Sequence, residues 1–349
     1  MIPEKMKAVV ITAPNKAEVM ELTTPKPAEG EILVRIEKCL LCTWEQRIFS
    51  GGDVALPFVP GHELSGRVAE IPEGTLTTLK VGDPVVVKTF DSCGQCEFCY
   101  RGDDNQCTGK PKKRYYDGIP GAGGLAQYLA IASNRVYALP DADADLDVAA
   151  FSEPLACCLR SMEQAEITFG EDVVIVGGGI MGQLHSLLAQ KSGARVILVE
   201  PDAARRDMAS KMGAHVVLNP IGIDPIQAIK DLTGGRGAHV IFFTVNVLKL
   251  AGDYIEALAK KGRMVYYGSF HPSGDVPFNP NKIHYSEKRI TGSYSPTAKG
   301  FWMASRVLGY QLIDVKPFIS ERYALAACQT AFERASSPET YRVLIDLWK

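Results

Sequence analysis

The strongest constraint on the fold is an alternation of strand-like and helix-like segments between residues 172 and 267. Short apolar runs recur there, and stretches of helical character of about ten residues separate them. Strands joined by helices favour a parallel sheet with right-handed crossovers. The pattern therefore predicts a doubly wound α/β domain with strands at 172–176, 195–199, 215–218, 240–244 and 263–267, and helices near 181–192, 202–212, 225–233 and 248–259.

The residues on either side of this region have a different character. From Lys7 to about Pro140, short apolar runs such as AVVIT and DPVVV alternate with Gly, Pro and Asp, which is typical of a mostly β domain. After about Ser293 only a helix-like segment (301–308) and a last strand-like run (342–349) remain, too short to bury a core alone. We expect domains at 1–150 and 151–293, with segment 294–349 returning to the first domain.

Composition narrows the class of partner. The 349 residues carry 38 basic and 40 acidic side chains, a net charge of −2, so no strong field attracts nucleic acid or an anionic membrane. A small-molecule partner is therefore expected. The first ten residues lack the features of a secretory signal, and no apolar run reaches the eighteen or so residues of a membrane span. These observations predict a cytoplasmic protein with no membrane partner.

A dinucleotide signature opens the α/β region. Gly177, Gly179 and Gly182 form G-x-G-x-x-G directly after the run DVVIV and directly before a helical stretch. The first glycine permits a tight turn, the second lets the backbone approach a pyrophosphate, and the third allows close packing of helix and strand. We expect these glycines to bind a dinucleotide, together with the intervening Ile180 and Met181.

The next strand bears on the choice of nucleotide. Glu200 ends it eighteen residues after Gly182, where a carboxylate accepts hydrogen bonds from ribose hydroxyls and repels a 2′-phosphate. NAD is therefore favoured over NADP. Arg205 and Arg206 follow closely, and an arginine there can accommodate a 2′-phosphate, so NADP stays as the alternative cofactor.

A second signature is a cluster of four of the nine cysteines. Cys93, Cys96, Cys99 and Cys107 follow C-x2-C-x2-C-x7-C, and four thiolates satisfy tetrahedral zinc completely, leaving no position for a substrate. The spacing predicts a structural zinc lobe at about residues 90–110, where the metal supplies folding energy. An iron–sulfur cluster uses the same ligand type and is the alternative.

A weaker constellation consists of Cys42, the pair His62 and Glu63 in PGHELSG, and Glu153 in SEPLACC. Spacing alone does not make these residues metal ligands, because a histidine beside a glycine is more often a hydrogen-bonded turn residue. The other cysteines have a structural interpretation: Cys157 and Cys158 as buried small residues on a helix, and Cys39 and Cys328 as core residues.

The order of these motifs resembles one known family. GHELSGRV, KVGDPVVV, the four-cysteine lobe, SEPLA and IVGGGIMG occur here in the order found in zinc-dependent medium-chain dehydrogenases. The chain resembles the sorbitol (polyol) and threonine dehydrogenase branch from Lys7 to the C-terminus. The resemblance implies a mostly β, GroES-like catalytic domain and a Rossmann domain, with the active site between them. It also implies a homo-oligomer, a dimer or a tetramer.

The resemblance also implies roles for particular residues. Cys42 and His62 would be ligands of a catalytic zinc, with Glu63 or Glu153 completing the protein set. Glu45 matches the family's acid three residues after the cysteine, which orients the ligand histidine. Zinc would act as a Lewis acid on the substrate oxygen while a hydride moves to the nicotinamide.

The chain departs from the family's pattern beside the catalytic cysteine. The family reads C-G-[ST]-D-x-H, whereas this chain reads CTWEQR from Cys42. Trp44 and Arg47 replace the hydroxyl and the imidazole that relay the alcohol proton, and Thr43 lies one position early. Trp44 near the zinc indicates a cyclic or otherwise distinctive substrate, or it fills a domain interface. Arg47, or the basic run 110–114, could hold an anionic group of the substrate.

Three functions follow from these features. The leading hypothesis is a zinc- and NAD-dependent dehydrogenase acting on a secondary alcohol of a polyol, sugar or cyclitol. A second is a zinc and NAD enzyme that uses transient oxidation for elimination or epimerisation. A third is a dinucleotide-binding protein without catalysis, which would hold zinc only in the cysteine lobe.

Overall fold

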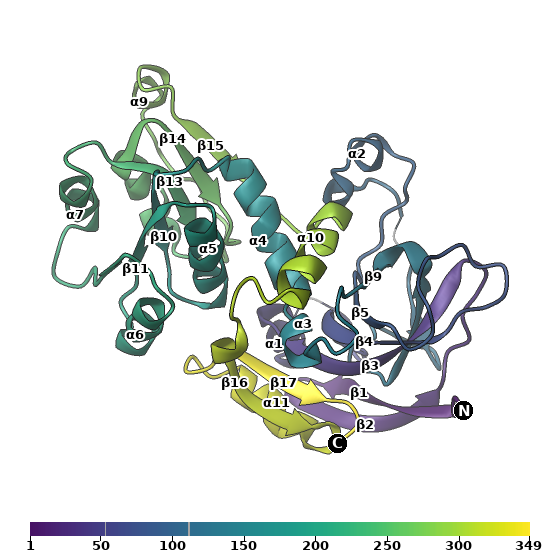
Figure 1. Ribbon diagram of the computed structural model, residues 1–349. Helices are drawn as coiled ribbons and strands as arrows, with labels where there is room; N and C mark the ends of the chain where they lie inside the picture. The colour runs from purple at the N-terminus through teal and green to yellow at the C-terminus, as the bar shows by residue number, and fades with distance from the viewer. Residues whose placement is uncertain (53, 111) are drawn as a thin grey trace. The chain divides into compact units, whose positions relative to one another are not determined.

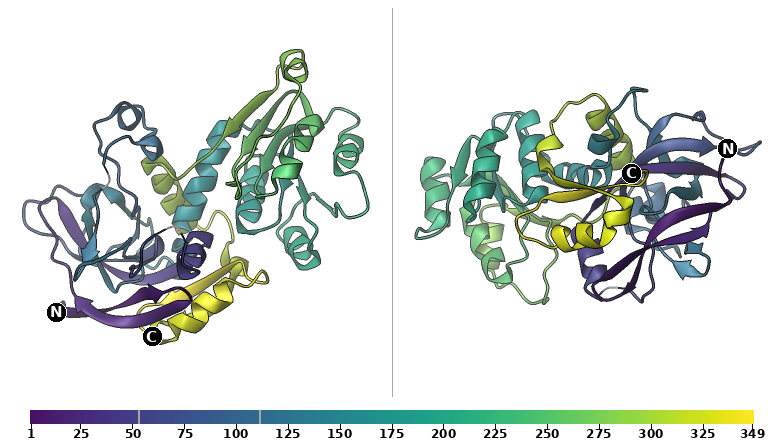
Figure 2. Two further views of the ribbon diagram at one scale, coloured as in Figure 1. Left: turned by 180° about the vertical axis from the view of Figure 1, so that it is seen from behind. Right: turned by 90° about the horizontal axis from the view of Figure 1, so that it is seen from below.

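The computed structural model describes residues 1–52, 54–110 and 112–349. It divides into two compact units (Figures 1 and 2). Unit 1 contains Met1–Ala156 and Pro296–Lys349, and unit 2 contains Cys157–Ser295. The helix α4 (Ser152–Ala165) contains the first boundary. The domain limits given above, at 150 and 293, stay predictions.

Unit 1 is built on a seven-stranded mixed sheet in the order β16-β17-β3-β4-β5-β9, with β8 also paired to β3. The strands are β3 (Glu31–Leu41), β4 (Glu63–Glu70), β5 (Pro84–Val87), β8 (Tyr128–Ala132), β9 (Val136–Ala138), β16 (Ile319–Ala324) and β17 (Arg342–Asp346). Two small sheets accompany it, formed by β1 (Lys5–Ala13) with β2 (Lys16–Thr23), and by β6 (Tyr115–Tyr116) with β7 (Ile119–Pro120).

The helices of unit 1 are short. They are α1 (Thr43–Phe49), α2 (Glu97–Tyr100), α3 (Leu146–Ala149), α10 (Ala298–Gly309) and α11 (Cys328–Ala335), with 3-10 turns η1 (Asp104–Gln106), η2 (Ser133–Arg135), η4 (Lys316–Phe318) and η5 (Leu325–Ala327). The C-terminal segment returns to the N-terminal strands, because β17 pairs antiparallel with β3, with Val343 opposite Leu41 (Figure 2). This pairing brings Arg342 beside the end of β3.

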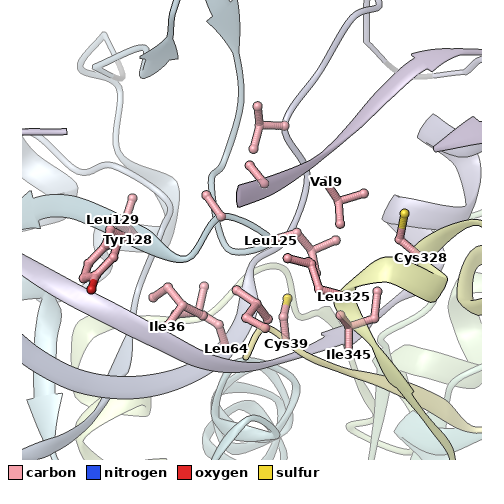
Figure 3. Close-up of a cluster of buried hydrophobic side chains, with 14 of the residues drawn as sticks. Val9, Ile36, Cys39, Leu64, Leu125, Tyr128, Leu129, Leu325, Cys328 and Ile345 are labelled. Carbon is pink, nitrogen blue, oxygen red and sulfur yellow. The ribbon is translucent and has the colours of Figure 1, made fainter. Parts of the chain in front are cut away.

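The core of unit 1 explains why its distant segments stay together. Figure 3 shows inward side chains of several strands, including Ile36 and Cys39 of β3 and Leu64 of β4, meeting Ile345 of β17. Cys328 of α11 also belongs to this core, so Cys39 and Cys328 are core residues as expected. Apolar side chains on one face of each strand exclude water there, which supplies the main driving force for folding.

Unit 2 contains a six-stranded parallel sheet in the order β12-β11-β10-β13-β14-β15. Its strands are β10 (Asp172–Val176), β11 (Arg195–Val199), β12 (Val216–Leu218), β13 (Ala238–Phe243), β14 (Leu258–Tyr266) and β15 (Arg289–Gly292). This order reverses between β10 and β13, as in the doubly wound dinucleotide-binding fold. The β10 sequence DVVIV is buried at every position, as a strand covered on both faces requires.

The helices of unit 2 connect successive strands along the chain and lie beside the sheet (Figure 1). They are α5 (Ile180–Lys191), α6 (Ala203–Lys211), α7 (Pro225–Leu232), α8 (Leu248–Ala251) and α9 (Pro280–His284), with the 3-10 turn η3 (Asp253–Ala257). Asp202 and Asp224 cap α6 and α7 by accepting hydrogen bonds from first-turn backbone N–H groups. The predicted helix at 248–259 is wrong, because α8 ends at Ala251 and β14 already begins at Leu258.

None of the helices in the described part of the chain has the length and apolar character needed to span a bilayer.

Candidate functional site

Three predicted site residues of unit 1 lie together. One ligand atom each of Cys42, His62 and Glu63 lies within 4.8 Å of the others, and all three residues are buried. The Cys42 Sγ and His62 Nε2 atoms are 3.4 Å apart. Zinc–sulfur and zinc–nitrogen bonds of about 2.3 and 2.0 Å at a tetrahedral angle require about 3.6 Å between such atoms. The pair therefore fits a shared zinc ion.

Strand pairing brings these residues together from distant parts of the sequence. Cys42 follows the last residue of β3, and Glu63 is the first residue of β4. The antiparallel register places Leu40 opposite Glu63, so the end of β3 meets the start of β4. Cys42 is also the N-cap of α1, and its Sγ accepts a hydrogen bond of 3.2 Å from the Trp44 backbone N–H.

The protonation state of Cys42 is coupled to metal binding. Burial, together with the nearby Glu45 carboxylate, raises the pKa of Cys42 to about 12. The sulfur is therefore a neutral thiol at pH 7 when only protein groups surround it. A bound metal ion deprotonates a coordinating thiol outright, so zinc binding here releases a proton.

Glu45 fixes the orientation of the His62 ring. Its carboxylate is completely buried, and its Oε1 lies 2.6 Å from His62 Nδ1. The same Oε1 accepts a hydrogen bond from the Gly61 N–H, and Oε2 accepts one from the Cys42 N–H. Burial raises the pKa of Glu45, but the charge and hydrogen bond of His62 outweigh it and hold this pKa below its usual value. Burial lowers the pKa of His62, but the neighbouring Cys42 and Glu45 raise it overall, so the ring is protonated when only protein groups surround it. Zinc at Nε2 would replace one ring proton, and the remaining Nδ1–H would donate to Glu45.

Glu63 has a partner that the sequence analysis missed. Arg342 Nε and Nη2 donate to its two carboxylate oxygens, each at 2.8 Å, and both side chains are buried. Burial lowers the pKa of Arg342, but the negative charges around it, first Glu63 and also Cys42 and Glu153, raise it overall. Glu153 is the second residue of α4, is buried, and does not belong to the three-residue group.

The residues that replace the family's proton relay lie on α1. Thr43 is its exposed first residue, and Arg47 is exposed in its last turn. Trp44 is half-buried, and its ring contacts the His62 ring edge-on, with centroids 5.3 Å apart. Two residues of the basic run are paired within unit 1: Lys112 with Glu31, and Arg114 with Asp91.

The four cysteines form a second group that fits zinc. Neighbouring Sγ atoms are 3.6 Å apart for Cys96 and Cys99, 3.9 Å for Cys96 and Cys107, and 4.0 Å for Cys93 and Cys99. Tetrahedral zinc with four thiolates requires about 3.8 Å along each edge. Backbone hydrogen bonds lower the pKa of Cys96 to about 5, whereas burial and the hydrogen bond to Cys96 raise the pKa of Cys99 to about 12. Zinc binding would therefore release the Cys99 proton.

The glycine turn of unit 2 has the geometry of a dinucleotide site. Gly177 follows β10 with φ of 106°, a conformation that side chains disfavour, and Gly179 is the N-cap of α5. A Cβ added to Gly182 would lie 1.8 Å from the Gly177 carbonyl oxygen, so the strand and the helix approach too closely for any side chain. Ile180 and Met181 open α5, directly after the turn.

Charged side chains border this turn. Glu200 follows β11 and is buried; its Oε2 accepts from the Gly178 N–H at 2.6 Å, and its Oε1 accepts from the Asp202 N–H at 2.8 Å. Arg206 donates to the carbonyls of Glu200 and Pro201. Arg205 Nη1 lies 3.9 Å from where a Cβ of Gly179 would stand, so its guanidinium reaches the turn.

Comparison with known proteins identifies the family. The model for the alcohol dehydrogenase GroES-like domain matches residues 28–141, and the model for zinc-binding dehydrogenases matches residues 181–306. A 2-dehydro-3-deoxy-L-galactonate 5-dehydrogenase of Pseudoalteromonas atlantica is 30% identical over 95% of this chain and 96% of its own. The chain belongs to the zinc-dependent medium-chain dehydrogenases. The predicted resemblance and the GroES-like plus Rossmann fold class are thereby confirmed.

Other members of the family match this dehydrogenase over nearly its full length. An L-threonine 3-dehydrogenase of Pyrococcus furiosus is 30% identical and covers 99% of both chains. The crystal structure of a putative zinc-binding dehydrogenase from Sinorhizobium meliloti, bound to NADP, has a TM-score of 0.89 and 26% identity, and covers 99% of this chain and 100% of that one. The expectation of a zinc-dependent oxidoreductase with a nicotinamide dinucleotide is confirmed at the level of the family.

Proposed function

We propose that this dehydrogenase transfers a hydride between NAD and a secondary alcohol of a polyol, sugar or cyclitol. The observation that supports it most is the buried pair of Cys42 Sγ and His62 Nε2, 3.4 Å apart, with Glu45 behind the histidine. The relative from Pseudoalteromonas atlantica, by its name, oxidises a sugar acid, which supports a polyhydroxylated substrate. Zinc bound at this pair supplies a Lewis acid for the alcohol oxygen, and the nicotinamide accepts the hydride.

The protein groups around the pair have separate tasks. Glu45 holds the tautomer of His62 that leaves Nε2 available as a ligand. The Trp44 N–H stabilises negative charge on Cys42 Sγ. Neither task involves the substrate directly, so loss of either group weakens metal binding before it changes the chemistry.

Two carboxylates are candidates for the remaining protein ligand of the catalytic zinc. Glu63 lies within reach of Cys42 and His62, but ligation would compete with its two hydrogen bonds to Arg342. The charge of Glu153 also raises the pKa of Arg342, so the two side chains interact electrostatically. Glu153 does not belong to the group of Cys42, His62 and Glu63. The zinc content of Glu63→Gln and Glu153→Gln separates the two: the variant that loses catalytic zinc identifies the ligand.

We propose NAD as the preferred nucleotide. Glu200 stands at the carboxyl end of β11, where its charge would repel a 2′-phosphate. Arg206 is held by two backbone carbonyls, whereas the Arg205 guanidinium reaches the glycine turn and is the positive charge that a 2′-phosphate would use. The relative with bound NADP makes the opposite preference a real alternative. The ratio of kcat/KM for NAD and NADP in the wild type and in Glu200→Ala tests the assignment, and the variant should lose the preference for NAD.

We also propose that the four-cysteine lobe holds a structural zinc ion and that the protein is a cytoplasmic homo-oligomer, a dimer or a tetramer. The sulfur geometry supports the metal. Zinc analysis of the purified chain tests the metal, its mass in solution tests the oligomeric state, and cell fractionation tests the location.

One experiment tests the proposed activity as a whole. Polyols, sugars, cyclitols and their phosphates are screened with NAD and with NADP, and reduced nicotinamide is followed by its absorbance. We expect reduction of NAD with at least one of these alcohols, lost in Cys42→Ala and His62→Ala. The proposal is wrong if no alcohol in the panel reduces either nucleotide. Product formation without net NADH would point instead to transient oxidation during elimination or epimerisation.

A further inference from the structure

Two aromatic rings flank His62 at the candidate catalytic centre of unit 1. The centroids of Trp44 and Phe90 each lie 5.3 Å from the His62 ring centroid, at interplanar angles of 75° and 58°. Trp44 and Phe90 also contact each other, with centroids 6.3 Å apart and planes inclined at 63°. The two rings are inclined rather than stacked, so they form two adjoining walls beside the metal-binding histidine.

Further contacts hold the Trp44 ring in place. Trp44 packs edge-on against the buried Phe58, with centroids 5.9 Å apart and an angle of 89°. Its backbone N–H is tied to Cys42 Sγ in the first turn of α1. A ring fixed in this way offers a preformed surface, so a ligand that packs on Trp44 does not have to order it.

Both walls keep accessible apolar surface next to the site. The Phe90 residue is 38% exposed, and Trp44 is half-buried. The pattern C-G-[ST]-D-x-H, which this chain resembles at Cys42, has a small hydroxyl residue at the position of Trp44, so the tryptophan exchanges a hydrogen-bonding group for a large apolar one. A substrate that gains from this exchange must present an apolar face.

We propose that Trp44 and Phe90 are specificity-determining residues that select a ring-shaped secondary alcohol, a cyclitol or a cyclic sugar, over an open-chain polyol. This inference rests on the proposed function. A saturated ring presents a compact face of C–H groups that packs against an aromatic surface, while its hydroxyl groups point outward at the rim. An open-chain polyol has no such persistent face and loses more rotational freedom when it is held against one.

The test compares two alcohols of similar size, myo-inositol and sorbitol, with zinc-loaded protein and NAD. We expect kcat/KM to be at least about tenfold higher for the cyclitol in the wild type. Trp44→Ser should lower kcat/KM for the cyclitol by about tenfold, mainly through KM, and should change the value for sorbitol much less. Trp44→Phe, which keeps a ring, should restore most of the preference, and Phe90→Ala should reduce it.

A binding readout accompanies the kinetics. The chain has three tryptophans, so the change in fluorescence on adding myo-inositol to the wild type but not to Trp44→Phe reports contact with this ring. The matched control is Trp302→Phe, because Trp302 lies exposed on α10 and has no place in the proposed wall. Its kinetics and its fluorescence response should equal those of the wild type.

The outcomes separate the two proposals. Oxidation of sorbitol in preference to myo-inositol, or an equal effect of Trp44→Ser on both alcohols, would overturn the inference and leave the proposed function intact. A preference for a cationic amino alcohol over both would also overturn it, because the walls would then serve a cation–π contact. If no alcohol at all reduces NAD, the proposed function fails and the inference fails with it.

Discussion

At the scale of single residues, the pair formed by Arg342 and Glu63 is the most consequential contact of the candidate site. Two hydrogen bonds of 2.8 Å join two side chains that are almost completely buried. Removing one partner of such a pair leaves an uncompensated charge away from water, which costs far more than the net gain of forming the pair. Arg342 therefore holds the Glu63 carboxylate in place.

We predict that Arg342→Gln lowers the free energy of unfolding by about 3–5 kcal/mol, because Glu63 keeps its charge and loses its partner. Urea unfolding of the zinc-loaded protein measures the change. The matched control is Arg334→Gln, which breaks the bond to Glu321, a pair with much more solvent exposure. It should cost only about 0–1 kcal/mol. Equal losses in the two variants would contradict the argument.

A second residue-scale prediction concerns Glu45→Gln. The amide keeps the shape and can still accept from His62 Nδ1–H, but the negative charge that strengthens the histidine as a ligand is lost. We expect the affinity of the catalytic site for zinc to fall by about 10–100-fold. Competition with a metal chelator measures this affinity. Glu97→Gln, an exposed glutamate of α2, provides the control and should leave it unchanged.

The residues of the site differ in how far the sequence can predict them. Cys42, His62 and Glu45 lie within local motifs of a known family, and the structure brings them together. Arg342 lies 279 positions from Glu63, and nothing in the run RVLID distinguishes it from an ordinary strand residue. Phe90 likewise carries no motif of its own. Their roles follow from strand pairing and packing, which only the fold supplies.

At the scale of elements, the turn from β10 to α5 is the candidate dinucleotide site. We predict that Gly182→Ala both lowers the melting temperature and abolishes NADH binding, because a Cβ there would lie 1.8 Å from a backbone oxygen of Gly177. Gly179→Ala should keep the melting temperature, since the nearest atom to its Cβ would be the Arg205 guanidinium nitrogen at 3.9 Å.

The Gly179→Ala variant nevertheless places a methyl group where a pyrophosphate would approach the helix N-terminus. Its dissociation constant for NADH, followed by nicotinamide fluorescence, should rise by at least about tenfold. Unchanged NADH binding in both variants would show that the turn does not hold the dinucleotide.

The packing of α5 makes the stability of unit 2 sensitive to pH. Burial lowers the pKa of His185 to about 4, against an opposing hydrogen bond to the Met181 carbonyl. The unfolded chain, with an ordinary histidine pKa of about 6.5, binds more protons between these values. Stability is therefore full above about pH 6.5 and falls as the pH drops towards 4, by about 3 kcal/mol in total.

We predict that His185→Gln flattens this acid dependence. Urea unfolding at pH 7, 6 and 5, followed by near-ultraviolet circular dichroism, measures the slope in each protein. The exposed His271→Gln is the control and should keep the wild-type slope. A wild-type slope in His185→Gln would assign the acid sensitivity to another group.

The elements of unit 2 were more predictable than those of the C-terminal segment. Buried parallel strands can be recognised in the sequence as continuous apolar runs, and the glycine motif marks the start of α5. The predicted helix at 248–259 is wrong because apolar residues of η3 and β14 follow α8 without a clear break. The helix α11 was missed although Cys328, Ala331, Phe332 and Ala335 follow helical spacing, because the segment is short and mostly polar elsewhere.

At the scale of the whole molecule, the chemistry is divided between two units with separate hydrophobic cores. Unit 1 contains both candidate metal groups, and unit 2 contains the glycine turn with Glu200. Unit 1 has a hydrophobic cluster of its own, and unit 2 has two further clusters around its sheet. Metal binding and nucleotide binding should therefore be separable by experiment.

The last prediction follows from this division. The wild type should contain two zinc ions per chain, and Cys96→Ser should contain one, because a thiolate of the four-cysteine lobe is lost. The lobe lies in a loop-rich segment with little buried apolar surface, so the variant should become more sensitive to proteolysis between residues 90 and 110. Its affinity for NADH should equal that of the wild type, since the glycine turn belongs to unit 2. A variant that keeps two zinc ions, or that loses NADH binding together with its zinc, would contradict this assignment of metal and nucleotide to separate units.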